Sequence, residues 1–367
     1  MARFSLLVLA ALIIAAAASS SLHRAAVDAA IVEGLQVGFY DRTCPEAEST
    51  IREIVNTDKN NDPTIPAGLI RIFFHDCFVK GCDASILLDE TPTPGEETEK
   101  QSPANGFTLN GLSTIDVAKS TIESLCPRTV SCADIVAFAA RDAAVAAGHP
   151  GYPVAAGRRD GLGSLKSSLP GNLPGPGQGV GEITRVFVGK GMTQEDAVVL
   201  SGAHSIGGAH CFMFSDRLYN FSAGADVDPA MDPGYAGMLR TVCPAPGSPD
   251  GEDPENAPKV AFDARTEQRL DTSYFVEVLS RRGLLGSDNA LAEDPGTRPL
   301  VEALARDVQL FQPGRESSCV HRKFAESMQK LGMVDVLVGE GNGEIRMDCR
   351  AVNTPGEQVP PTLPSEF

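Results

Sequence analysis

One short segment, Arg71–Ser85 (RIFFHDCFVKGCDAS), combines basic, acidic, thiol and hydroxyl side chains within fifteen residues. If it begins as a helix, Arg71 and His75 lie on one face, about one turn apart. An isolated pair of this kind is more often a surface arginine beside a hydrogen-bonded histidine. Phe74 next to His75 favours a functional site instead, because an uncompensated charge against an apolar wall is costly.

The end of the same segment offers oxygen ligands. Asp76, Asp83 and Ser85 supply hard oxygen atoms, and Gly81 permits a turn. Backbone carbonyls can complete the shell that calcium requires. A second acidic segment, AFDARTEQRLD, places the carboxylates of Asp263 and Asp271 and the Thr266 hydroxyl within nine residues. It also suits calcium, although an acidic loop with caps is the commoner explanation.

Two of the six histidines, His75 and His204, fall within predicted helices. His204 lies at a helix end in LSGAHSIG. A metal-bound imidazole needs a partner for its other ring nitrogen, commonly a carboxylate. Taken alone, the segment LSGAHSIG is as typical of a capped helix end as of a site with a metal-binding histidine. We interpret His149, His210 and His321 as surface residues.

The chain's beginning and composition favour export. A basic Arg3 precedes an apolar run from Phe4 to Ala18, followed by small residues. This pattern predicts a signal peptide over residues 1–29, with cleavage at about residues 20–35. Nine cysteines in an exported chain indicate disulfides with one thiol unpaired, and spacing alone leaves the pairing open. Asn220-Phe221-Ser222 is an N-glycosylation sequon.

The net charge of −17 argues against nucleic acid or an anionic membrane as partner. Apolar periodicity and capping signals predict a mostly α fold, and the lack of sustained alternation predicts only short strands. We predict one domain over residues 30–353 and a Pro-rich tail over 354–367. The expected helices are Thr43–Asn56, Ile65–Val79, Leu112–Leu125, Asp134–Gly148 after a Ser131 cap, Ala197–His204 after a Thr193 cap, Tyr274–Arg282 and Arg322–Leu331. Gly- and Pro-rich loops are expected at Thr91–Gly95, Pro170–Gly181, Pro244–Pro258 and Asp294–Pro299.

The segments GLIRIFFHDCFVKGCDASILLD and VVLSGAHSIGGAHC resemble the distal and proximal haem signatures of the secretory plant peroxidases, class III. Further segments match in the family's order over roughly Gly38–Asn353: FYDRTCP, TEKQSPAN, PRTVSCADIVAFAARD, GRRDG, DRLYNFS, FDARTEQRLDTSYF, GLLGSD and IRMDCR. The resemblance implies the plant haem peroxidase fold. In it about ten or more helices form a distal and a proximal half around the haem, with very little β structure.

The resemblance also implies roles for individual residues. His204 would be the axial ligand of one haem b, with Asp288 accepting its ring N–H and Phe262 packing nearby. On the distal side His75 would be the proton acceptor and Arg71 the transition-state stabiliser. The supporting residues would be Phe74 as the apolar wall, Asn105 bonded to His75, Glu99 holding Asn105, and Pro150 helping to seat an aromatic donor.

Two calcium ions and four disulfides follow from the same resemblance. The distal ion would be bound by Asp76, Val79, Gly81, Asp83 and Ser85. The proximal ion would be bound by Ser205, Asp263, Thr266, Arg269 and Asp271. The implied disulfides are Cys44–Cys126, Cys77–Cys82, Cys132–Cys349 and Cys211–Cys243. Cys319 is left over, and we expect it to be half-buried and inert.

The implied activity is reduction of hydrogen peroxide with one-electron oxidation of small phenolic donors. Such chemistry serves lignification, wall cross-linking, oxidative-stress responses and peroxide removal. We expect a monomer outside any membrane, in the extracellular space or cell wall, with the vacuole as an alternative. Phe73 and Asn110-Gly111-Leu112 depart from the usual family residues at positions that are not catalytic. Phe212 and Met213 stand where donor-contacting residues often lie, so the preferred donor stays open. Two rival hypotheses are a scaffold without turnover and a calcium-binding module without haem, which would leave His75 and His204 without a task.

Overall fold

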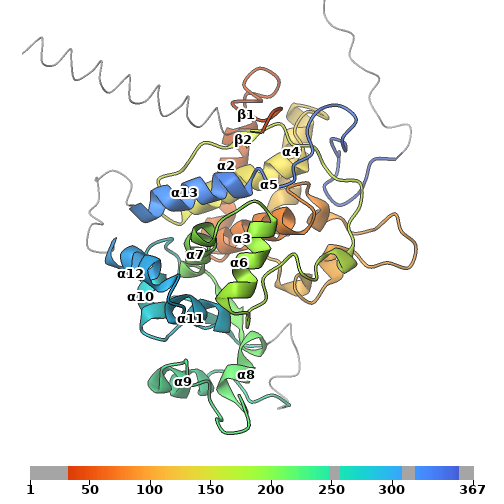
Figure 1. Cartoon of the computed structure of the whole chain (residues 1–367). Coiled ribbons are helices and arrows are strands. Elements are labelled where there is room, and N and C mark those ends of the chain that lie inside the picture. The colour runs from red at the N-terminus through yellow and green to blue at the C-terminus, as the bar shows by residue number, and fades with distance from the viewer. Residues whose placement is uncertain (1–31, 248–256, 308–318, 355–367) are drawn as a thin grey trace, which may run out of the picture.

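The computed structural model describes residues 32–247, 257–307 and 319–354, and within them the chain is mostly helical (Figure 1). Twelve α-helices, α2 to α13, fall in these ranges. The strands are only two or three residues long, as predicted. β1 (Gln36–Val37) pairs antiparallel with β2 (Ala155–Ala156), and β3 (Gly208–His210) pairs antiparallel with β4 (Lys259–Ala261).

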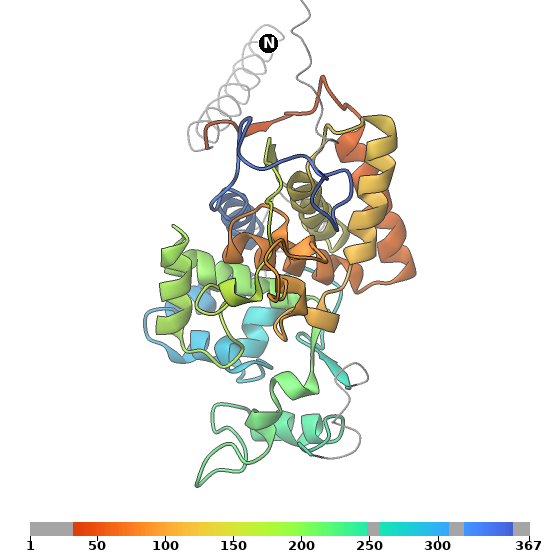
Figure 2. The ribbon, with the colours of Figure 1, turned by 90° about the vertical axis from the view of Figure 1, so that its right-hand side faces the viewer.

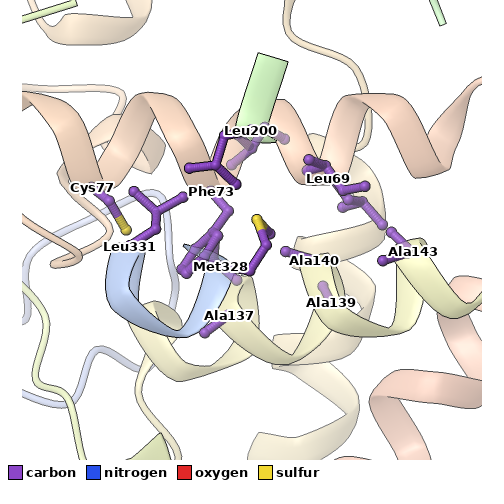
Figure 3. Packing of buried hydrophobic residues seen from close by; sticks show 14 of the residues in the cluster. Leu69, Phe73, Cys77, Ala137, Ala139, Ala140, Ala143, Leu200, Met328 and Leu331 are labelled. Carbon is purple, nitrogen blue, oxygen red and sulfur yellow. The ribbon is translucent and has the colours of Figure 1, made fainter. Parts of the chain in front are cut away.

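The first half of the chain is built around α5 (Cys132–Ala146), whose residues are almost all buried. Against it pack α2 (Ala47–Asn61) and α3 (Ile65–Val79), and α4 (Leu112–Leu125) lies beside α2 and α5. Small side chains on α5 let α3 approach closely. Figure 3 shows Leu69 and Phe73 of α3 facing Ala137 and Ala140 of α5.

The second half contributes α6 (Val180–Gly189), α7 (Gln194–Ser201), α10 (Ser273–Leu279), α11 (Gly286–Glu293), α12 (Arg298–Arg306) and α13 (Cys319–Leu331). Leu200 of α7 and Met328 of α13 join the same core as α3 (Figure 3). A separate, smaller core lies under α8 (Ser215–Leu218) and α9 (Pro233–Arg240), which extend from one end of the molecule (Figure 2).

Several helix boundaries agree with the sequence signals. α3 and α4 begin and end at the predicted residues. The Ser131 hydroxyl accepts a hydrogen bond from the Asp134 amide, and Thr193 forms a capping box with Asp196. The start predicted for the first helix, at Thr43, is wrong, because α2 begins at Ala47, after Glu46, without a side-chain cap.

The four predicted disulfides are all present: Cys44–Cys126, Cys77–Cys82, Cys132–Cys349 and Cys211–Cys243. Cys319 is free and exposed, so the expected half-buried position is wrong. It is the first residue of α13 and points away from that helix's buried face.

The surface positions expected for His149 and His321 are also wrong, since both are buried between α5 and α13. The His149 ring bonds to the His321 carbonyl oxygen through Nε2 (2.9 Å) and accepts from the Gly151 amide through Nδ1 (2.9 Å). Burial lowers the pKa of His149 to about 4, so the ring is neutral at physiological pH. His210 is half-buried and bonds to the Ala257 carbonyl oxygen (3.0 Å).

The predicted signal peptide and nearly all of the Pro-rich tail lie outside the described residues. Among the helices that the structure describes, none has the length and apolar character needed to cross a bilayer.

Candidate functional site

The last two turns of α3 carry Arg71 and His75 on one face, as their spacing predicts. The Arg71 guanidinium is fixed from one side. Its Nη1 donates to the carbonyl oxygen and hydroxyl of Thr108 (2.7 and 3.0 Å), and its Nη2 donates to the Ala104 carbonyl oxygen (2.8 Å). These acceptors are all neutral, so the positive charge of Arg71 is held in place without being neutralised.

His75 is oriented by Asn105. Its Nδ1 lies 2.6 Å from the Asn105 Oδ1, while the Asn105 Nδ2 donates to the Glu99 carbonyl oxygen (2.8 Å). Because the amide nitrogen is committed to a carbonyl, the amide oxygen faces the ring and must accept from the Nδ1–H. The tautomer is thereby fixed, and the Nε2 lone pair of His75 has no partner among the described residues.

Burial and the charge of Arg71 lower the pKa of His75 to about 3, although the bond to Asn105 opposes the shift. The imidazole is therefore neutral at physiological pH and can accept a proton. Arg71, Phe74 and His75, together with Ala67, keep intermediate accessibility on an otherwise buried helix, so they border space that the described chain does not fill. The Phe74 ring lies edge-on to the His75 ring at 5.7 Å, which makes it an apolar neighbour of the base.

Glu99 holds Asn105 through its backbone carbonyl, whereas its carboxylate points elsewhere. The Glu99 side chain is fully buried, and neither carboxylate oxygen has a hydrogen-bond partner among the described residues. Burial and the charge of Asp83 raise its pKa to about 7. The Ser85 hydroxyl beside it is also buried without a partner. Such orphaned oxygen atoms are costly unless a cation or water binds them.

The other candidate distal ligands lie near these unpaired oxygen atoms of Glu99 and Ser85. The Asp76 and Asp83 carboxylates are buried and partly satisfied by the amides of Ala84 and Ser85 (2.9 and 3.0 Å). Burial and the charge of Asp83 raise the pKa of Asp76 well above its usual range.

 A glycine at position 161 is required here, because a Cβ atom would collide with the Asp83 carboxylate. The Val79 carbonyl oxygen is instead occupied by the Lys190 ammonium (3.4 Å). Two buried carboxylates, a free hydroxyl and a third carboxylate fit a hard cation such as calcium.

His204 lies in the 3₁₀ turn Gly202–Ser205 that follows α7. Its Nδ1 is 2.8 Å from the Asp288 Oδ1, and the Asp288 carboxylate is almost fully buried while the imidazole keeps 34% exposure. With Nδ1 committed to the carboxylate, Nε2 is left to bind a metal. The Phe262 ring stacks on the imidazole at 4.2 Å and 9°, which fixes the ring plane.

Tyr274 belongs to this group although sequence reasoning did not select it. Its hydroxyl donates to the same Asp288 oxygen (2.9 Å), and the Leu285 amide donates to the other (3.1 Å). Burial and the charge of Asp288 raise the pKa of Tyr274 well above its usual range, so the hydroxyl stays a donor. In the sequence, the one signal that could have identified Tyr274 is its position in the segment LDTSYF.

The candidate proximal calcium ligands also lie together, with Arg269 at their edge. The Thr266 hydroxyl donates to the Asp263 carboxylate (2.9 Å) and lies 3.3 Å from the Asp271 carboxylate, while the Ser205 hydroxyl accepts from the Asp271 amide (3.2 Å). Burial and the charge of Asp263 raise the pKa of Asp271. This set of oxygen atoms follows His204 directly through Ser205 and fits a hard cation as well.

The two histidine regions meet where α3 approaches the turn after His204. At Gly207, which has a φ of +75°, an added Cβ would lie 2.6 Å from the Ala67 Cβ, one helical turn before Arg71. Pro150 is exposed next to His149, whose ring faces α13, and its role in seating a donor stays a prediction.

Phe73, which departs from the usual residues of the family that the sequence resembles, is a core residue. It is buried against α5 and α13 (Figure 3) and lies away from the half-exposed residues on the other face of α3. This departure therefore leaves the group of Arg71, Phe74 and His75 intact.

Comparison with known proteins gives consistent results. The family model described as "Peroxidase" matches residues 48–307. The chain is similar to "Peroxidase 5" of Vitis vinifera, at 44% identity over 87% of this chain and 92% of that protein. It is also similar to "Peroxidase 57" and "Peroxidase 39" of Arabidopsis thaliana, at 41% and 42% identity, each over 87% of this chain and 93% of the relative. On these matches, together with a mostly helical fold that pairs His75 with Asn105 and His204 with Asp288, the chain belongs to the peroxidase family.

Proposed function

We propose that this chain is an exported plant peroxidase that uses one haem b to reduce hydrogen peroxide and oxidise small phenolic donors one electron at a time. The observation that carries the proposal is the contrast between its two half-exposed imidazoles. Both present Nε2 and engage Nδ1, but His204 is backed by a carboxylate and His75 by a neutral amide.

That contrast assigns the two roles. A carboxylate partner gives His204 anionic character, which suits an axial ligand of iron. An amide partner carries no charge, so His75 stays neutral at physiological pH, as its lowered pKa also requires. When bound, the haem supplies the redox chemistry that splits the peroxide bond, and the chain's residues position and protonate the peroxide.

His75 would accept the proton from one peroxide oxygen and return it to the other, departing oxygen. Arg71, held by the Thr108 and Ala104 oxygens, would stabilise the negative charge that develops on the departing oxygen. Because both groups are fixed before peroxide enters, little reorganisation is needed during the reaction. Phe74 would keep bulk water from the His75 ring.

Two calcium ions would stabilise the segments that carry the histidines. The distal ion would bind Asp76, Gly81, Asp83 and Ser85, with the Val79 carbonyl available once Lys190 releases it. The proximal ion would bind Ser205, Asp263, Thr266, Asp271 and the Arg269 carbonyl. The ions would carry no part of the reaction, and their work is to hold α3 and the turn at His204 in place.

Export is supported by two features of the folded chain. Four disulfides are formed, as expected in an oxidising compartment. Asn220 is exposed, so a glycan could be attached to its sequon. We propose a monomer in the cell wall or extracellular space, with the vacuole as the alternative destination. Lignification, wall cross-linking and peroxide removal are the processes that its chemistry suits.

The proposal is tested by replacing His75 with leucine in the haem-loaded chain. Loss of a general base predicts a fall of about 10²–10⁴-fold in the second-order rate constant with hydrogen peroxide. Stopped-flow mixing measures that rate, and an unchanged haem absorption spectrum and melting temperature show that the fold is retained. A variant that reacts at nearly the wild-type rate would refute the role of His75, and a wild-type chain that takes up no haem would refute the function itself.

A further inference from the structure

Arg346 brings a buried positive charge to the candidate distal calcium site. Its side chain is fully buried, although it lies far in the sequence from the acidic residues of that site. Its Nη1 donates to the Ala84 carbonyl oxygen (2.8 Å), and its Nη2 donates to the carbonyl oxygens of Gly161 and Asp83 (2.6 and 3.5 Å). The guanidinium therefore holds the backbone that carries Asp83 and Ser85, two of the candidate ligands.

Gly161 lies between this guanidinium and the Asp83 carboxylate. Its carbonyl oxygen accepts from Arg346, while a Cβ atom at the same residue would collide with the Asp83 Oδ2. In the part of the chain that the structure describes, every acceptor of the Arg346 guanidinium is a backbone carbonyl oxygen, so its charge is close to the carboxylate without a direct ion pair. Burial raises the pKa of Asp83, while hydrogen bonds from Ser85 and the charge of Arg346 oppose the shift.

The buried carboxylates of the distal site outnumber this cation. Asp76, Asp83 and Glu99 are all buried, and neither Glu99 oxygen has a hydrogen-bond partner among the described residues. The short turns that begin at Ser85 and Glu99 pack against each other, so Glu99 belongs to the same cluster. Three ionised carboxylates and one guanidinium leave two negative charges uncompensated, which matches the charge of one divalent cation.

Two other charged residues leave this balance unchanged. Asp160 is buried, but its carboxylate accepts from the amides of Cys132, Ala133 and Arg346 (3.1, 2.9 and 2.9 Å) and is stabilised at the start of α5. Lys80 acts on the cluster through its charge, but its side chain is exposed and water screens it.

We propose that Arg346 sets the charge selectivity of the distal site, by matching the site to one divalent cation and disfavouring a trivalent one. The inference rests on the distal calcium ion of the proposed function and adds to it a residue that binds no ion itself. The repulsion between a fixed positive charge and a bound ion grows with the charge of the ion. Arg346 therefore costs a trivalent ion about 1.5 times as much binding free energy as a divalent ion of similar size.

The test measures calcium and lanthanum(III) binding by calorimetry in the full-length, haem-loaded protein after a chelator has removed its metal ions. The readout is the ratio of the two dissociation constants, because a loss of hydrogen bonds alone would weaken the binding of both ions together. Arg346→Gln removes the charge but can still donate to a carbonyl oxygen, whereas Arg346→Lys keeps the charge and loses the planar fork. Lys80→Met removes an exposed positive charge and is the matched control. The proximal site, which has no bond to Arg346, is an internal reference in each titration.

Arg346→Gln should shift the ratio toward lanthanum by about 3- to 10-fold at one of the two sites, as expected for a partly screened unit charge a few ångströms away. Glu99→Gln should shift the ratio at the same site toward calcium, and the double variant should return it to near the wild-type value. Arg346→Lys and Lys80→Met should change it by less than about twofold. Melting in excess calcium checks the fold of each variant. If Arg346→Gln alone does not fold, the double variant is compared with Glu99→Gln, and the same shift toward lanthanum is expected.

An unchanged ratio in Arg346→Gln would overturn the proposal, and so would an equal shift in Arg346→Lys, because the side chain would then act only through its hydrogen bonds. A wild-type protein whose metal binding is insensitive to Glu99→Gln would overturn it as well, by showing that no ion binds at the distal cluster. None of these measurements uses peroxide. A chain that binds both ions in the expected ratios but does not react with peroxide would refute the proposed function and leave this inference standing.

Discussion

Replacing Asn105 with alanine should slow the reaction with peroxide without abolishing it. The Asn105 amide accepts from the His75 ring across 2.6 Å and is itself held by the Glu99 carbonyl. Its bond raises the pKa of His75 against the larger effects of burial and Arg71. Removing it makes the imidazole less basic and allows the other tautomer, in which Nε2 carries the proton and cannot accept one.

The magnitude follows from the single bond that is lost. A neutral hydrogen bond contributes about 0.5–1.5 kcal/mol net. At about 1.4 kcal/mol for each factor of ten, the rate constant should fall about 2- to 12-fold. His75→Leu removes the base entirely and should cost about 10²–10⁴-fold. The predicted order of rates is therefore wild type, then Asn105→Ala, then His75→Leu.

The assay is stopped-flow mixing with hydrogen peroxide between about pH 5 and 8. Asn342→Ala is the matched control, because that amide also donates to a backbone carbonyl (Val338, 2.9 Å) but lies in an exposed loop. An Asn105→Ala variant as fast as wild type would show that the bond does not tune the base. One as slow as His75→Leu, with normal haem absorption, would show that the amide does more than we infer.

Three further predictions concern pH, the proximal bond and calcium. Because the pKa of His75 is about 3, the rate constant with peroxide should stay level as the pH falls from 8 to 5 and decline only near pH 3, where the ring gains its proton. A midpoint near pH 6.5 in stopped-flow data would contradict the inference that burial lowers the pKa of His75. Asp288→Asn should replace the charged partner of His204 by a neutral one, a difference of about 1–2 kcal/mol in hydrogen-bond energy. Redox titration should then give a haem reduction potential that is higher by roughly 40–90 mV. Tyr274→Phe leaves the Asp288 carboxylate in place and should shift the potential less. Removing calcium with a chelator should lower the melting temperature by roughly 5–10 °C, since saturated binding stabilises the fold by about 3 kcal/mol. Added calcium should restore the melting temperature better than magnesium does, and an unchanged melting curve in calorimetry would refute the calcium sites.

The sequence predicted the helices whose signals are local. α3 and α4 have strong apolar periodicity and clear ends, so their bounds agree with the structure. α6, α9, α11 and α12 were not predicted. α12 begins in a segment that we interpreted as a loop because of Pro299, yet proline is favoured in the first turn of a helix. α9 begins in the same way, with Pro233 after an Asp232 cap.

Within the candidate site, the residues found from sequence are those with distinctive side chains at regular spacing, such as His75 and Arg71. The sequence could not show that Thr108 and Ala104 hold Arg71, because two of the three bonds use backbone carbonyls that any residue offers. It could not single out Tyr274 either, since its partner Asp288 lies fourteen residues away on another helix. His149 and His321 were misjudged for a related reason, because their polar partners are mostly backbone groups.

The arrangement around His75 explains why a metal far from the reaction could still control it. His75 is followed directly by Asp76, a candidate distal ligand, so α3 itself connects the base to the oxygen cluster. A second connection runs from the His75 ring through Asn105 to the Glu99 backbone, and the Glu99 carboxylate is buried with the unsatisfied Ser85 hydroxyl. Losing the cation would leave buried carboxylates repelling one another at the end of both connections. The ring can keep its place only if neither α3 nor Glu99 moves, so the distal cation and the basicity of His75 should be lost together.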